Sequence, residues 1–73
     1  MSLNARQREE LSRYEFDLYA ELFRMNVKQL RTRANQQHIS LEGLSSKGAI
    51  VQEMVGQLRA RRLSDMKRRI NER

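Results

Sequence analysis

The chain contains no cysteine and no proline, and only three glycines and four aromatic residues among its 73 residues. Without cysteine there is no disulfide framework and no thiolate metal site, which suits a reducing cytosolic setting. No apolar run approaches the roughly 20 residues of a membrane-spanning helix, and the N-terminus lacks the basic and then apolar layout of a signal peptide. We therefore expect a soluble protein of the cytoplasm.

The residues that catalysis or cofactor binding would need are also scarce. There is no glycine-rich phosphate loop, no metal-ligand spacing and no nucleophile paired with a base. The single histidine, His38, has no partner by spacing and is interpreted as a residue at a helix end. Acidic residues such as Glu9 are interpreted as a solvated helix face with i,i+4 pairing to Arg13. We expect no catalytic residue, no metal, no cofactor and no enzyme activity.

The length allows at most one domain with a marginal core, because a chain this short buries only about 60% of its unfolded surface. From residue 5 to about residue 24 there is neither proline nor glycine, and Ser2 or Asn4 can cap this segment. Its apolar residues recur at spacings of three and four, which predicts an amphipathic helix that carries all four aromatic residues. Most of this stripe is expected to pack in the core; the alternative is that Tyr14 or Phe16 stays exposed and binds a partner protein.

A second helix is predicted over residues 27–38. Asn26 can accept a backbone N–H bond and Gln29 stands three residues later, which forms a capping box. An apolar stripe follows at Val27, Leu30 and Ala34.

An extended loop is predicted over residues 39–45, because its apolar residues alternate around a glycine without a helical period. Ile39, Leu41 and Leu44 are expected to attach the loop to the core; an exposed one among them would be a candidate anchor for a partner. Ser45 or Ser46 can then cap a third helix, predicted over 47–63, whose core face is a broad apolar stripe of Ile50, Val51, Met54, Val55 and Leu58.

The C-terminal residues continue with high helix propensity, but the step from Leu58 to Leu63 is five residues, so the apolar stripe rotates. We expect helix to about residue 63 and only partial order beyond it. The predicted organisation is an all-α domain over residues 1–63, followed by a basic tail or frayed helix end over 64–73.

The formal charge of +6 is concentrated at this end. Counted by segment, residues 1–25 carry −1, residues 26–58 carry +2 and residues 59–73 carry +5. Such a distribution favours a polyanion or an acidic protein surface as the partner. A membrane surface is not expected, because the apolar face beyond residue 58 is thin. The candidate binding residues are Lys28, Arg31, Arg33, Ser46, Lys47, Gly48, Arg59, Arg61, Arg62, Lys67, Arg68 and Arg69.

The stretch 26–58 resembles the helix–extended-loop–helix motif of the SAP, HeH and Rho-N-terminal-like group. The run LSSKGAIV at 44–51 carries the resemblance, with Lys47 at the position of the motif's lysine and Ile50-Val51 at its aliphatic pair. The resemblance implies DNA binding, in which the N-terminus of the third helix would meet a phosphate. Val55-Gly56 stands where that group usually has arginine and leucine, and a long aromatic helix precedes the motif; both departures weigh against simple DNA binding.

The whole chain also resembles small bacteriophage transcription regulators, from a phage of Xanthomonas, that bind host RNA polymerase. The common features are the length, the acidic and aromatic first helix and the arginine-rich end. This resemblance implies a non-enzymatic regulator that inhibits or redirects transcription in the bacterial cytoplasm, with DNA bound alone or within the complex. A monomer is expected. The alternative hypothesis is a stand-alone DNA-binding module that contacts the phosphate backbone.

Overall fold

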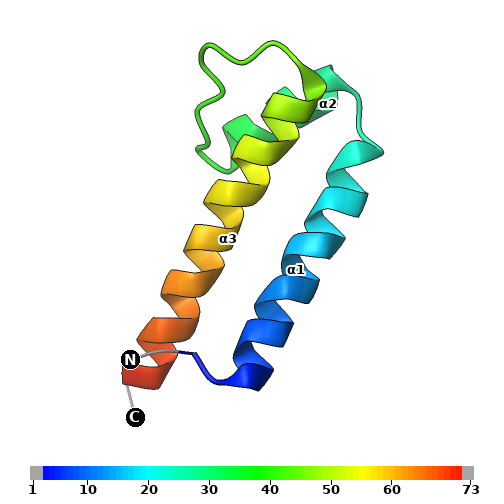
Figure 1. The fold of residues 1–73 in the computed structure, drawn as a ribbon. Helices are drawn as coiled ribbons and strands as arrows, with labels where there is room; N and C mark the ends of the chain where they lie inside the picture. Colours follow the sequence, from blue (N-terminus) through cyan, green and yellow to red (C-terminus); the bar gives the residue numbers. More distant parts are fainter. Residues whose placement is uncertain (1–2, 72–73) are drawn as a thin grey trace.

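The computed structural model describes residues 3–71, and the side chains of residues 3–69. Three helices make up this part of the chain: α1 (Ala5–Phe23), α2 (Val27–Gln36) and α3 (Lys47–Asn71). α1 and α3 lie side by side and antiparallel, and α2 packs at the end where α1 finishes and α3 begins (Figure 1). The described chain measures 41 × 21 × 17 Å. The predicted all-α fold with an extended loop before the third helix is confirmed.

Two asparagines begin α1 and α2 by the same capping box. The Asn4 side chain accepts a hydrogen bond from the Gln7 backbone at 2.8 Å, and the Gln7 side chain accepts one from the Asn4 backbone at 3.1 Å. Asn26 and Gln29 repeat this arrangement at 2.8 and 3.0 Å. Each pair satisfies backbone N–H groups that a helix start leaves without partners.

At the start of α3, Ser46 is the capping serine of the two that the sequence offers. Its side chain accepts a bond from the Ala49 N–H at 3.2 Å, and its backbone carbonyl accepts one from the Ile50 N–H at 3.0 Å. Ser46 therefore ends the loop and begins α3 with both its side chain and its backbone.

The end of α2 is a Schellman motif. The Ile39 N–H donates to the Ala34 carbonyl at 2.8 Å, and the His38 N–H donates to the Asn35 carbonyl at 3.2 Å. This geometry requires a left-handed residue, and His38 adopts it with φ of 57°. The motif turns the chain so that Ile39 points into the core, where it is 3% exposed.

The loop after α2 is attached to the core, as predicted. Ile39 and Leu41 are buried, and Leu44 is partly buried against them. The Leu44 N–H donates to the Leu41 carbonyl at 3.1 Å, which closes a tight turn. Gly43 occupies the third position of this turn with φ of 80°, a value that disfavours residues with a Cβ atom.

The core lies at the end of the molecule where all three helices meet. Its largest fully buried residues come from each helix, and α3 contributes most of them; they are Leu22, Leu30, Ile50, Val51, Met54 and Val55. Towards the other end only α1 and α3 remain in contact, and there Leu11 and Met66 are 4% and 7% exposed. The hairpin of α1 and α3 therefore buries apolar side chains at both of its ends, but only one end has a core built from three helices.

The third helix is longer than the predicted range 47–63. α3 continues without a break to Asn71, and the buried Met66 shows that its last turns are packed. The physical reason is that the first turns of α1 lie beside these last turns (Figure 1), so Met66 is covered by a helix that the pattern of residues 59–73 alone does not reveal. Residues 72–73 of the predicted tail lie outside the described residues. Between residues 3 and 71 no helix is long and apolar enough to span a membrane.

The left-handed backbone at His38 predicts that glycine is a better residue there. His38→Gly should raise the free energy of unfolding by about 0.5–1 kcal/mol, because the relief of strain exceeds the added entropy of the unfolded chain. Urea unfolding followed by circular dichroism measures the change. His38→Ala is the matched control: alanine keeps the Cβ atom and should give no gain. Equal stability of the two variants would contradict this explanation.

Candidate interaction surface

The twelve predicted binding residues do not form one surface. Six of them lie at the end of the molecule that holds α2 and the start of α3: Lys28, Arg31, Arg33, Ser46, Lys47 and Gly48. The other six follow α3 from Arg59 to Arg69, towards the opposite end of the 41 Å long axis (Figure 1). The structure therefore divides the predicted site into separate regions, whose contacts differ.

Three of the basic residues near α2 make contacts within the protein. The Lys47 ammonium donates to the Phe23 carbonyl at 2.6 Å, in the last turn of α1. Arg31 donates to the Leu44 carbonyl at 3.0 Å, and Arg33 forms an ion pair with Glu21 of α1. A cation at a helix C-terminus is stabilised by the free carbonyls there. Lys47 and Arg33 therefore connect α1 to its neighbours, and Arg31 connects α2 to the loop.

Ser46 and Gly48 are exposed at the start of α3. The Ser46 hydroxyl is used as the helix cap, as described above. A Cβ atom added at Gly48 would meet no atom within 4 Å, so nothing in the described chain requires glycine for packing at this position.

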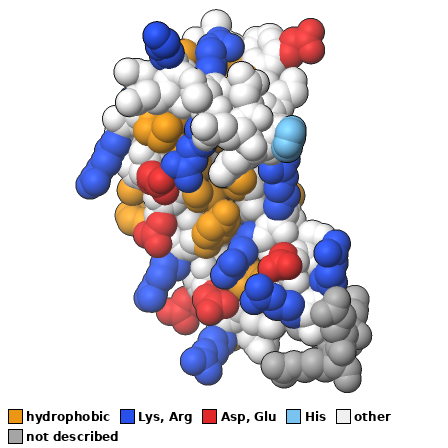
Figure 2. Space-filling view, turned by 180° about the vertical axis from the view of Figure 1, so that it is seen from behind, with side chains coloured by type: hydrophobic (Ala, Val, Ile, Leu, Met, Phe, Trp, Pro, Cys, Tyr) orange, Lys and Arg blue, Asp and Glu red, His pale blue; other side chains and the backbone are white. Residues whose placement is uncertain are grey.

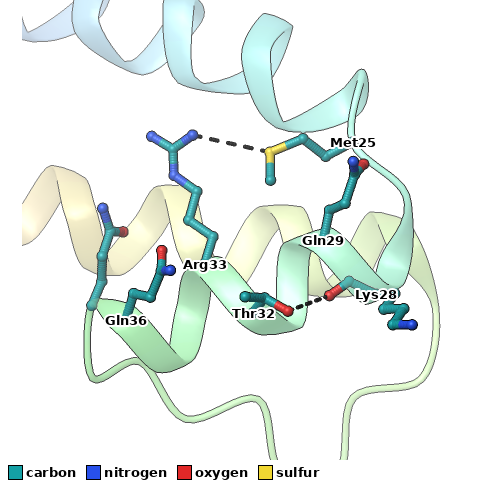
Figure 3. Close-up of a pocket in the computed structure, with 7 residues that line it drawn as sticks. Met25, Lys28, Gln29, Thr32, Arg33 and Gln36 are labelled. Atoms are coloured by element: carbon teal, nitrogen blue, oxygen red, sulfur yellow. Dashed lines mark hydrogen bonds between the residues drawn. The ribbon is translucent and has the colours of Figure 1, made fainter.

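A shallow cavity of about 550 Å³ lies between the end of α1 and one face of α2 (Figure 3). Six of its seven lining residues have polar side chains, although carbon atoms make up most of the lining surface; the residues are Met25, Lys28, Gln29, Thr32, Arg33, Gln36 and Gln37. Arg33 points across it towards the Met25 sulfur, 4.0 Å away, and the Thr32 hydroxyl donates to the Lys28 carbonyl at 3.1 Å. The Gln37 side-chain oxygen is buried without a hydrogen-bond partner in the described chain. These groups can donate and accept hydrogen bonds, but they include no acid–base or nucleophilic pair.

The arginines in the middle of α3 also contact the neighbouring helices. Arg59 forms an ion pair with Glu15 of α1 at 3.1 Å. The Arg62 guanidinium lies over the Tyr14 ring, 5.5 Å from its centroid, in a cation–π contact. Both contacts connect α3 to α1.

Arg61 connects α3 to the end of α2. It donates to the Gln37 carbonyl at 2.6 Å and, at 3.4 Å, to the His38 carbonyl. These carbonyls belong to the Schellman motif, where a cation is favourable. The central arginines thus share an orientation towards other helices, although each remains partly in contact with solvent.

The far end of the hairpin remains basic at its surface. Lys67 and Arg68 are exposed, and Arg69 pairs with Asp65 one turn earlier at 3.3 Å. Because α1 is antiparallel to α3, its first turns bring Arg6 and Arg8 to the same end (Figure 1). We define residues 3–13 and 62–71 as the basic end; they carry seven basic and three acidic side chains, a net charge of +4. Figure 2 shows blue and red side chains interspersed over this half of the molecule.

Sequence reasoning missed the contribution of Arg6 and Arg8 to this end. Residues 1–25 carry a net charge of −1, so nothing in the first helix alone indicated a basic surface. Only the antiparallel pairing of α1 with α3 brings these arginines to the same end of the molecule as Lys67 and Arg68. The pairing depends on contacts between residues some 50 positions apart, for which the sequence carries no local signal.

The first helix also exposes two aromatic rings. Phe16 is 73% exposed and Phe23 is 50% exposed, whereas Tyr14 is half-buried beneath Arg62. Of the two aromatic residues considered as exposed anchors, Phe16 is the one that faces solvent. The exposure of Phe23 was not predicted.

His38 is exposed at the turn after α2, where its backbone performs the structural role described above. Within residues 3–71, no three histidine, aspartate or glutamate residues lie close enough to share a metal ion. Comparisons of the chain with models of protein families, with curated proteins and with solved structures find no match. What the protein binds is therefore inferred from its own residues and contacts.

The contacts of Arg61 predict an effect on stability that arginines without contacts to another helix lack. Arg61→Ala should lower the free energy of unfolding by about 1 kcal/mol, because the carbonyls at the end of α2 lose a charged donor. Arg68→Ala is the matched control on the same helix and should change it by less than about 0.5 kcal/mol. Chemical denaturation measures both. A loss for Arg68→Ala as large as that for Arg61→Ala would contradict the assignment of Arg61 as an interhelical contact.

Proposed function

We propose that the protein is a small, non-enzymatic transcription regulator, encoded by a bacteriophage, that binds host RNA polymerase and inhibits or redirects transcription. The basic end is the surface that makes the contact. The resemblance of the whole chain to phage regulators suggests this class, and the distribution of free and engaged basic side chains supports a protein partner.

One observation carries the proposal: the basic residues divide into those that connect the helices and those that face solvent. Lys47, Arg59 and Arg61 donate to groups within the protein. Lys67 and Arg68 are exposed on the last turns of a packed helix, and the first turns of α1, which carry the exposed Arg6 and Arg8, lie at the same end of the molecule. A partner is therefore offered charges held on a rigid pair of helices, which lowers the entropy cost of binding.

The alternative of a stand-alone DNA-binding module is less well supported. That module would present Ser46, Lys47 and Gly48 to a phosphate, with Arg31 and Arg33 as flanking charges. The Lys47 ammonium instead lies 2.6 Å from a carbonyl of α1, and Arg31 and Arg33 contact the loop and Glu21. Phosphate binding there would have to compete with these contacts.

The basic end itself fits a protein surface better than a phosphate backbone. Glu9, Glu10 and Asp65 lie among its basic residues, and a mixed pattern of charges can be matched by a protein surface with its own pattern. A polyanion would instead be repelled at each acidic position. An acidic patch on the polymerase is the expected complement, and the charges should both speed association and set its orientation.

Charge reversal at each end of the molecule tests this assignment. Lys67→Glu should weaken binding to immobilised bacterial RNA polymerase by about tenfold, because it places a like charge against the acidic patch. Lys28→Glu removes one exposed lysine from the opposite end and should change binding by less than about twofold. Surface plasmon resonance at two salt concentrations measures both affinities.

Two results would overturn the proposal. Equal effects of Lys67→Glu and Lys28→Glu would show that the basic end is not the contact. Tight, strongly salt-dependent binding to duplex DNA, with no binding to purified polymerase, would establish the DNA-binding alternative instead.

A further inference from the structure

α1 has two apolar faces, and only one of them is used by the fold. Leu11, Leu18 and Leu22 point into the hairpin and the core. Phe16, Ala20 and Phe23 follow each other at spacings of four and three, so they form a second stripe on the opposite side of the helix. All three are exposed, and they include both phenylalanines of the protein. We call this stripe the outer face of α1.

The outer face is ordered and accessible within the described chain. Phe16 is 73% exposed and Phe23 is 50% exposed. The Tyr19 ring stacks on Phe23 with 6.2 Å between centroids, which restricts the Phe23 ring. An exposed apolar stripe bordered by charged residues is typical of a surface that binds another protein.

The charges beside the stripe are arranged so that the face complements itself. Asp17 and Arg24 lie on the same flank of the stripe, one on each side of Ala20 along the helix, and both are exposed. No ion pair engages either of them within residues 3–69. When two copies of a helix pair in antiparallel orientation about a two-fold axis, the same flanks meet. Asp17 of each copy then faces Arg24 of the other.

The register that joins these charges also places the apolar residues. The two-fold axis then passes close to Ala20, whose small side chain permits close approach of the helices. With a rise of about 1.5 Å per residue, Phe16 lies roughly 7 Å from the axis on one side and Phe23 roughly 4 Å on the other. Phe16 of one copy therefore lies beside Phe23 of the second copy, and the four rings fill the contact.

We propose that the outer face of α1 binds a second copy of this chain in an antiparallel, two-fold symmetric dimer. The four exposed rings would bury roughly 500 Å² of apolar surface, and the charged flanks enlarge the contact to about 1,000 Å², the lower end for specific interfaces. The dimer is therefore reversible, in contrast to the monomer expected from the sequence. Antiparallel pairing directs the two basic ends away from each other, so this inference is independent of the proposed function.

Sedimentation velocity tests whether the face associates. The wild-type chain should sediment mainly as a dimer at about 500 µM and as a monomer at about 1 µM. Phe16→Ala should remain monomeric at both concentrations, with unchanged helix content by circular dichroism. Gln52→Ala, an exposed control on α3, should dimerise as the wild type does. A monomeric wild type at the higher concentration, or a Phe16→Ala variant that still dimerises, would overturn the proposal.

Charge exchange tests the partner and the register together. D17R and R24D should each weaken dimerisation about tenfold, because each places like charges together twice across the axis. The double variant D17R/R24D restores two opposite-charge pairs and should recover an affinity within about threefold of the wild type. No recovery in the double variant would contradict the proposed register.

Single cysteines test the antiparallel orientation, which is simple here because the chain has no cysteine. Ala20→Cys lies near the axis and should cross-link efficiently with a short bis-maleimide. Ser12→Cys is exposed on the same helix but lies far from its counterpart in the other copy, so it should not cross-link. Efficient cross-linking at both positions would show parallel pairing and would contradict the proposal.

Discussion

The antiparallel contact between α1 and α3 is the constraint on which the rest of the structure depends. Leu18 and Leu22 of α1 join Ile50, Met54 and neighbouring residues of α3 in one buried cluster, which α2 and its loop complete. A helix of ten residues such as α2 is marginally stable by itself. It therefore depends on the surface that the paired α1 and α3 provide for it to pack against. The same contact continues to Leu11 and Met66, and it explains why α3 stays helical far beyond the three-helix core.

The basic residues of the protein differ in what they contact within this arrangement. The central arginines of α3 and Lys47 contact other parts of the protein. They donate hydrogen bonds to backbone carbonyls and to a carboxylate, and one of them lies over an aromatic ring. Exposed contacts of this kind contribute little individually, about 0–1 kcal/mol for a surface ion pair. A domain with so small a core nevertheless gains a useful fraction of its stability from several of them. Lys28, Lys67 and Arg68 are exposed and make no such contact within residues 3–69. In the proposed function the exposed charges of the basic end, where only two helices pack, are the ones that meet the partner.

Local features of the fold could be predicted from the sequence. The Asn26–Gln29 capping box and the burial of Ile39 and Leu41 depend on residues a few positions apart, and both are confirmed. The third helix is longer than predicted because its last turns, including the buried Met66, pack beside the first turns of α1, which lie far away in the chain. The left-handed residue at the end of α2 is a histidine, whereas glycine or asparagine is the usual signal for that motif.

The candidate site was less predictable than the fold. A list of basic residues does not distinguish Arg61, which contacts carbonyls of α2, from Arg68, which faces solvent; that difference arises only when the helices pack. The same holds for the outer face of α1, since either stripe of that helix could have been the buried one. The sequence therefore predicts a binding protein with a basic surface. It does not show which basic side chains contact other helices and which stay exposed to a partner.

The most direct test of the account is to map the binding surface by NMR, titrating the ¹⁵N-labelled protein with bacterial RNA polymerase. The account predicts that amide signals of the basic end, residues 3–13 and 62–71, broaden first and that those around Lys28 and Ser46 follow only the general loss of intensity. Selective broadening at Ser46, Lys47 and Gly48 in the presence of duplex DNA, with no response to polymerase, would contradict it.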